Sequence, residues 1–170
     1  MKNMLVGIVV SLLAGISYAS PYVSISAGSS TVDACDGVAS CDDGSTGFKL
    51  LGGYKFNPNL AVEGGYFDFG KASAPGDTLK INGFGVGGAF HYDVNSDFGV
   101  VARLGVANMK AKDSAASVSE SSTQLYGGLG LGYKVAPNWS VDAAYDFSKA
   151  KLLGEKIKAH MFSVGLTFAF

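Results

Sequence analysis

The chain has 170 residues, of which 16% are charged, 12% are aromatic and 24 are glycine, and its formal net charge is −1. This length fits one domain, and the mixture of few charges with many glycines excludes a disordered chain and is unusual for a soluble one. A net charge near zero provides no basic face for DNA or RNA, so nucleic acid is not expected as a partner.

The first 19 residues have the pattern of an export signal. Lys2 gives a positive start, an apolar run extends from Met4 to Ile16, and small residues end the segment at Ala19. This run is too short to cross a bilayer as a helix, which requires about 20 apolar residues. We therefore expect cleavage after Ala19, with residues 1–19 as a signal peptide and residues 20–170 as the mature domain.

Both cysteines, Cys35 and Cys41, lie in one polar stretch. Disulfides persist in the oxidising compartments that export reaches, so we expect a local disulfide that pins a loop. The alternative, two thiolate ligands of a metal ion, lacks the two further Cys or His ligands of a closed zinc site. The same stretch contains four acidic residues: Asp33, Asp36, Asp42 and Asp43. Their spacing differs from that of an EF-hand calcium loop, so no metal site is predicted.

From Pro21 onward the chain alternates between strand-like runs and polar breaks, without helical periodicity. Eight strands are predicted, at residues 21–28, 47–56, 60–69, 80–92, 98–109, 123–135, 139–148 and 157–170. Three breaks are short turns (57–59, 93–97 and 136–138) with the Asn, Asp and Pro residues of tight reversals, and the others (29–46, 70–79, 110–122 and 149–156) are long. Antiparallel pairing then places the short turns and both termini at one end, as in bacterial membrane barrels.

Each predicted strand has one apolar row and one row of glycines and charged residues, because successive side chains of a strand point to opposite faces. Phe84, Leu104 and Leu129 belong to the apolar row. The other row contains six charged residues: Lys49, Glu63, Arg103, Lys134, Asp142 and Asp146. Glycine fits the crowded interior of an eight-stranded barrel, so we assign this second row to the lumen, where charges of opposite sign can pair. The alternative is a soluble ligand-carrying barrel with the apolar row inside.

Aromatic side chains gather at the strand ends beside the short turns. They are Tyr54, Phe56, Tyr92, Phe98, Tyr133, Trp139, Phe168 and Phe170. Aromatic rings with a polar edge favour the headgroup level of a membrane, so the sequence predicts an aromatic girdle at one interface. The girdle favours an apolar row that faces lipid.

The last strand, SVGLTFAF at residues 163–170, has the polar residue, Gly and two aromatics with which membrane barrels end. With LAVEGGYFDFG at residues 60–70 and the turns NPN and APNW, the mature chain resembles the OmpA-type eight-stranded barrels, including small opacity-like surface proteins. This resemblance implies an all-β, antiparallel, up-and-down transmembrane barrel in the outer membrane of a Gram-negative bacterium, with periplasmic termini and extracellular long loops.

The resemblance also implies partners and a lumenal network. The barrel assembly machinery would read Gly165, Phe168 and Phe170, and outer-membrane lipid with lipopolysaccharide would surround the barrel. The six charged residues of the second row would form an ion-pair network that seals the lumen. Four lysines of the last long loop offer contacts to lipopolysaccharide phosphate: Lys149, Lys151, Lys156 and Lys158.

Some barrels of this size modify lipid A with His and Ser near the outer leaflet, so His160 and Ser163 are the first candidates for catalysis. His160 and Ser163 are three residues apart on one strand, so they face opposite sides at a separation of about 10 Å. His91 falls on the lumenal row, where a structural role is expected. No nucleophile, base and orienting group converge, so neither an enzyme nor a cofactor is predicted.

Three functions therefore follow from the sequence. The preferred hypothesis is a structural surface protein whose external loops contact a host surface molecule or the environment. The alternative is a narrow, porin-like channel for ions or small solutes, motivated by the charged lumenal row. The third is a lipid A-modifying enzyme.

Overall fold

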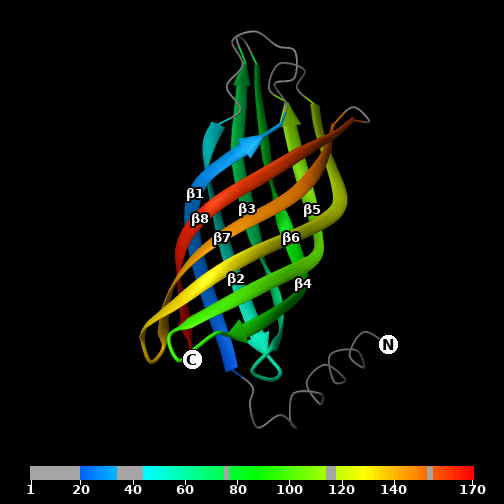
Figure 1. Ribbon diagram of the computed structural model, residues 1–170. Coiled ribbons are helices and arrows are strands. Elements are labelled where there is room, and N and C mark those ends of the chain that lie inside the picture. The colour runs from blue at the N-terminus through cyan, green and yellow to red at the C-terminus, as the bar shows by residue number, and fades with distance from the viewer. Residues whose placement is uncertain (1–19, 34–43, 75–76, 114–117, 153–154) are drawn as a thin grey trace, which may run out of the picture.

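The computed structural model describes residues 20–33, 44–74, 77–113, 118–152 and 155–170. They form the strands β1 (Ser20–Val32), β2 (Gly44–Lys55), β3 (Leu60–Ala74), β4 (Asp77–Asp93), β5 (Phe98–Asp113), β6 (Val118–Ala136), β7 (Trp139–Leu152) and β8 (Glu155–Ala169). Each strand is antiparallel to the next and β8 pairs with β1, so the sheet closes into a barrel (Figure 1). The predicted fold class is confirmed. None of the described residues belongs to a helix capable of crossing a membrane.

The first and last strands pair over most of their length. The ladder runs from Tyr22 opposite Ala169 to Val32 opposite Ala159, with Ile25 opposite Leu166 between them. Closure matters because hydrocarbon offers no hydrogen-bond partner to an open strand edge. Figure 1 shows the strands winding steeply around the axis, with the start of β1 and the end of β8 at the same end of the barrel.

The apolar row faces outward. Phe84, Leu104 and Leu129 are 69%, 66% and 65% exposed, as expected for side chains that would contact lipid rather than a barrel core. This arrangement contradicts the alternative of a soluble barrel whose apolar row lines a ligand pocket.

The short turns have the predicted chemistry. Asn57 Oδ1 accepts the backbone N–H groups of Asn59 and Leu60 at 2.9 and 2.8 Å. Asn95 Oδ1 accepts those of Asp97 and Phe98 at the same two distances. In both turns the asparagine side chain supplies the acceptor that a tight reversal of the backbone lacks.

The opposite ends of the strands extend further than predicted. Most of the long loops predicted at residues 70–79, 110–122 and 149–156 belong to strands β3 to β8. Beyond the apolar row the outward side chains become polar, as at Lys80 opposite Lys112 and Lys110 opposite Ser121. The alternation therefore continues with its faces exchanged, because polar side chains such as Lys80 point outward and apolar ones such as Ile81 point inward.

The lumen has two layers of different character. Near the long-loop end the inward side chains form an apolar cluster that includes Val32, Phe69, Ile81, Met109 and Met161, each fully buried. Nearer the short turns charged and hydroxylated side chains point inward together with small apolar ones such as Ala61 and Ala89. The sequence predicted only the polar layer, because charged residues and glycines alone had been assigned to the lumen, although most of these apolar residues lie in predicted strands.

Two adjacent glycines of β4 test which face of the strand is crowded. A Cβ on lumen-facing Gly87 would overlap backbone atoms of Leu104 and Gly105, whereas one on outward-facing Gly88 would have its nearest neighbour, Ala61 O, at 3.9 Å. We expect Gly87→Ala to destabilise the barrel by about 1–3 kcal/mol through overpacking. We expect Gly88→Ala to stabilise it by about 0.4–1 kcal/mol by restricting the unfolded chain. Urea titration in lipid vesicles measures both, and equal effects of the two changes would contradict this assignment of faces.

Candidate functional site

A buried ion pair joins opposite sides of the barrel in the polar layer. Lys49 of β2 points inward because its neighbours Phe48 and Leu50 point outward, and its ammonium contacts Asp146 of β7. The two side chains are 2% and 0% exposed. Tyr126 donates its hydroxyl to the other Asp146 oxygen at 3.0 Å. Because water is excluded, each charge depends on these partners for its stabilisation.

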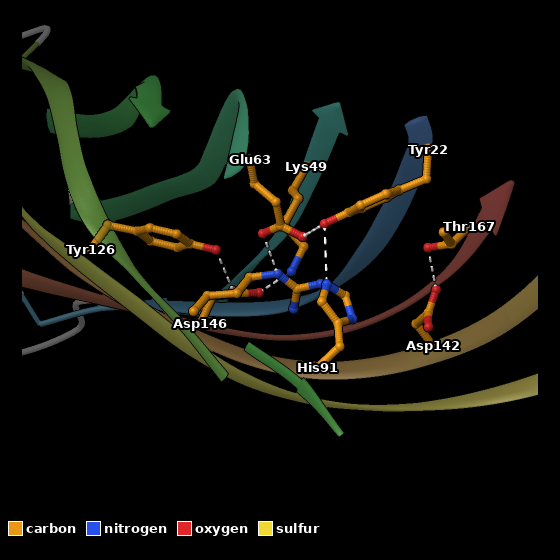
Figure 2. Close-up of polar contacts among 9 residues, drawn as sticks. Tyr22, Lys49, Glu63, His91, Tyr126, Asp142, Asp146 and Thr167 are labelled. Carbon is orange, nitrogen blue, oxygen red and sulfur yellow. Dashed lines mark hydrogen bonds and ion pairs between the residues drawn. The ribbon is translucent and has the colours of Figure 1, made fainter. Parts of the chain in front are cut away.

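A second ion pair lies in the same layer. Arg103 Nε of β5 donates to Glu63 Oε2 of β3 at 2.7 Å, and Tyr22 of β1 donates its hydroxyl to Glu63 Oε1 at 2.5 Å. The Tyr22 oxygen also lies 3.3 Å from His91 Nε2. Figure 2 shows these groups converging in the lumen. Both oxygens of the Glu63 carboxylate are therefore satisfied.

The other two charged residues predicted for the lumen lie nearer the short turns. Thr167 donates its hydroxyl to Asp142 Oδ2 at 2.5 Å. Lys134 Nζ lies 3.8 Å from Asp93 Oδ2, and the two side chains are 50% and 63% exposed. Four of the six residues thus form two buried pairs: Lys49 with Asp146, and Arg103 with Glu63. Lys134 lies outside this buried layer, near the last short turn, where the lumen is open.

The sequence reasoning missed the tyrosines that complete these pairs. Tyr22 precedes outward-facing Val23, and Tyr126 follows outward-facing Leu125, so the alternation of each strand places both hydroxyls in the lumen. Tracking that alternation through every aromatic residue would have identified them.

A polar cavity of about 150 Å³ separates the buried pairs from the short turns; we call it the vestibule. Its charged lining residues are Lys55, Arg103, Lys134, Asp93, Asp97 and Asp142, and Tyr22, His91 and Thr167 contribute polar groups. The apolar cluster lies on the other side of the ion pairs. The lumen is therefore hollow toward the short turns and packed with apolar side chains toward the long loops.

The eight aromatic residues predicted for the girdle all lie near the short-turn ends of their strands. Their rings contact one another in pairs: Tyr54 with Phe56 at 5.6 Å between centroids, and Phe98 with Tyr133 at 4.7 Å. Phe168 contacts both Trp139 and Phe170 at 4.9 Å. Tyr92 is also exposed at this level. The rings thus surround this end of the barrel.

Lysines occupy the outward face of the strand extensions. Lys71 of β3 lies opposite Lys80 of β4, which lies opposite Lys112 of β5. Lys80 Nζ contacts Asp68 Oδ2 at 2.9 Å, and this hydrogen bond and the carboxylate charge raise the pKa of Lys80. Lys110, two residues before Lys112, is also exposed. We call Lys71, Lys80, Lys110 and Lys112 the lysine row.

His160 and Ser163 face opposite sides of β8, as predicted. Ser163 is buried in the lumen, whereas His160 faces outward, with Nδ1 at 2.9 Å from the Tyr145 hydroxyl and Nε2 at 3.7 Å from Asp33 Oδ2. The two side chains therefore cannot act together on one substrate.

Several predicted features lie outside the described residues. They are the signal peptide at residues 1–19, the disulfide between Cys35 and Cys41, and the acidic residues Asp36, Asp42 and Asp43.

A closed eight-stranded barrel with an outward apolar row and a charged, largely buried lumen defines an outer-membrane β-barrel protein of Gram-negative bacteria. Residues 4–170 match the family described as the outer membrane protein beta-barrel domain, and the chain belongs to this family.

Relatives of the chain include attachment proteins. The attachment invasion locus protein of Yersinia enterocolitica is 28% identical over 169 residues, which cover 90% of this chain and 88% of that protein. Its counterpart from Yersinia pseudotuberculosis is 30% identical over 140 residues, covering 75% and 74%. The crystal structure of Ail, the attachment invasion locus protein of Yersinia pestis, superposes with a TM-score of 0.61 at 28% identity, covering 90% of this chain and 99% of that one.

Two further structures extend the comparison. Ail of Yersinia pestis in complex with the heparin analogue sucrose octasulfate has a TM-score of 0.60 at 26% identity, with 90% and 99% of the two chains covered. Neisserial surface protein A has a TM-score of 0.69 at 20% identity, covering 89% and 99%, and shares the fold.

Proposed function

We propose that this protein is a structural surface barrel of the outer membrane that contacts sulfated polyanions of host surfaces through its long-loop end. The observation that carries this proposal is the lysine row on the strand extensions. The similarity to attachment proteins, one of which has been crystallised with a heparin analogue, supports it.

The lysine row concentrates positive charge that the described residues neutralise only at Lys80. Lys71, Lys80 and Lys112 lie side by side on three neighbouring strands, an arrangement that is unfavourable for like charges unless anions are supplied. Asp68 neutralises Lys80, whereas Lys71, Lys110 and Lys112 have no ion pair among the described residues. An anionic chain lying along this face would provide the missing counter-charges.

The orientation follows from the same proposal. The long loops would be extracellular, the short turns and the termini periplasmic, and the aromatic rings near the short turns would lie at the inner interface. Lipopolysaccharide would surround the outer half, with its phosphates near Lys149 and Lys158, which face outward opposite each other. The barrel assembly machinery would recognise β8 through Gly165, Phe168 and Phe170.

A non-enzymatic role is part of the proposal. Ser163 is enclosed in the lumen, and His160 on the outside contacts Tyr145 and Asp33 rather than a serine. These contacts suit a structural link between β7, β8 and the end of β1.

Replacing the unpaired lysines with glutamine tests the proposed contact. We expect the triple variant Lys71→Gln, Lys110→Gln and Lys112→Gln, reconstituted in lipid nanodiscs, to bind immobilised heparin at least about tenfold more weakly than wild type. Wild-type binding should weaken as salt is added, because these charges are exposed to solvent. Lys134→Gln removes the same charge at the other end of the barrel and should leave binding unchanged. Equal affinity of wild type and the triple variant would refute the proposal.

The alternative function is a narrow channel, and the charged vestibule favours it. The apolar cluster between the vestibule and the long loops opposes it, because an apolar constriction excludes ions by staying dry. Recordings in planar bilayers separate the two functions: a steady conductance of the wild-type protein would support the channel.

A further inference from the structure

We propose that the vestibule at the short-turn end is a binding site for a small monocarboxylate, held by Arg103 and Lys55. This site is at the opposite end of the barrel from the lysine row, so it is independent of the proposed attachment function. The argument rests on the unused hydrogen-bond donors that face the cavity.

Arg103 has more donors than its partner can use. Its side chain is 9% exposed and lines the vestibule, and only its Nε–H has an acceptor among the described residues, Glu63 Oε2. Both terminal guanidinium nitrogens are left without one. A guanidinium presents five donors in a planar fork that matches a carboxylate, so these unused donors require acceptors from water or from a ligand.

Lys55 brings a second cation to the same cavity. It points inward from β2, and its ammonium lies 5.9 Å from the centre of the Tyr22 ring. No carboxylate among the described residues forms an ion pair with it. The neighbouring acids have other partners: Glu63 accepts from Tyr22 and Arg103, Asp142 accepts from Thr167, and Asp93 lies 3.8 Å from Lys134 Nζ.

The acids near the opening set the charge that the ligand can carry. Arg103 lies opposite Gly128 of β6, whereas Asp142 lies opposite Gly132, closer to the short turn. Asp93 and Asp97 lie closer still, at the turn between β4 and β5. A ligand with one carboxylate could place it at the deep, cationic end, whereas a second negative charge would face these acids.

The size of the cavity limits the ligand to a small molecule. Its volume is about 150 Å³, enough for a few water molecules or one small organic molecule. The apolar cluster closes the lumen beyond the ion pairs, so the ligand would enter and leave through the short-turn opening. In the proposed orientation that opening faces the periplasm.

Arg103 is the one arginine of the chain, so protein labelled with ¹⁵N-arginine gives a single Nε–Hε signal from the site. We expect propionate, added to the folded full-length protein in nanodiscs, to shift this signal saturably. Propionamide, which has the same shape without the charge, should cause no saturable shift. A vestibule that holds only water would give no saturable shift with propionate, and that result would overturn the proposal. Equal shifts with propionate and propionamide would also overturn it.

A lysine variant tests the second contact. Lys55→Gln should weaken propionate binding about tenfold, the loss expected for one charge-assisted hydrogen bond. Lys71→Gln, an equal charge change at the other end of the barrel, should not alter it. Unchanged affinity in folded Lys55→Gln protein would overturn the role of Lys55. If this variant does not fold, the comparison of propionate with propionamide on wild type still decides whether the site exists.

Discussion

Asp146→Ala is expected to destabilise the barrel by about 3–5 kcal/mol, the cost of leaving one partner of a buried ion pair without the other. The change would leave the Lys49 ammonium uncompensated in the lumen and would remove the acceptor of the Tyr126 hydroxyl. Urea titration of the barrel in lipid vesicles measures the free energy of unfolding, and the heat-dependent shift in gel mobility reports whether the barrel is folded.

Two controls separate the effect of burial from that of charge. Asp93→Ala removes a carboxylate whose partner, Lys134, is half exposed, so it should cost no more than about 1 kcal/mol. The double variant Lys49→Met and Asp146→Leu removes both charges and should recover much of the lost stability. Equal losses of unfolding free energy in Asp146→Ala and Asp93→Ala would show that water reaches the Lys49–Asp146 pair, contrary to its burial in the structure.

Val86→Arg is expected to destabilise the membrane-inserted barrel by about 2–4 kcal/mol, because it places a charge on the lipid-facing surface at mid-strand. Val86 is 55% exposed and lies opposite Val106 on β5, between the aromatic rings near the short turns and the lysine row. Insertion into vesicles should slow, and the urea midpoint should fall.

The matched control is Val94→Arg, which makes the same substitution in a short turn. Val94 is similarly exposed but lies beyond the strand ends, where water can solvate the new charge. Its cost should be no more than about 1 kcal/mol, the value typical of the interface. Full tolerance of Val86→Arg would contradict lipid contact at that position.

The fold was predictable wherever one face of a strand had to be apolar. Val23, Phe84 and Leu129 alternate with glycines or small polar residues, and that alternation gave the strand number. The glycines and the aromatic girdle gave the facing of each row, and the Asn, Asp and Pro residues gave the short turns. It could not give the long-loop ends of the strands, because there polar residues such as Lys80 and Lys110 point outward and apolar ones inward, the reverse of the apolar row. Hydrogen bonds to neighbouring strands hold those segments, and pairing between distant residues leaves no local pattern.

The lumenal site was predictable in composition and less so in pairing. Charged residues inside a narrow barrel must find partners, so Lys49, Glu63, Arg103 and Asp146 could be assigned to one layer from the sequence. Which acid pairs with which base depends on the register and tilt of strands that are far apart in the chain. The apolar cluster was missed for a different reason: Ile81 and Met109 lie in strands that were predicted, but only charged residues and glycines had been assigned to the lumen.

The length of the strands has a consequence for recognition. β6 has 19 residues and β4 has 17, whereas about 9–11 residues of a tilted strand suffice to cross a bilayer. At about 3.3 Å per residue, the surplus of roughly six residues in β4, which carries Lys80, amounts to some 20 Å of ordered ladder. The lysine row thus lies on ordered strands, so a polyanion that docked there would meet a preorganised surface. Such docking avoids much of the entropy cost of about 1–2 kcal/mol for each backbone residue that a mobile loop would have to fix.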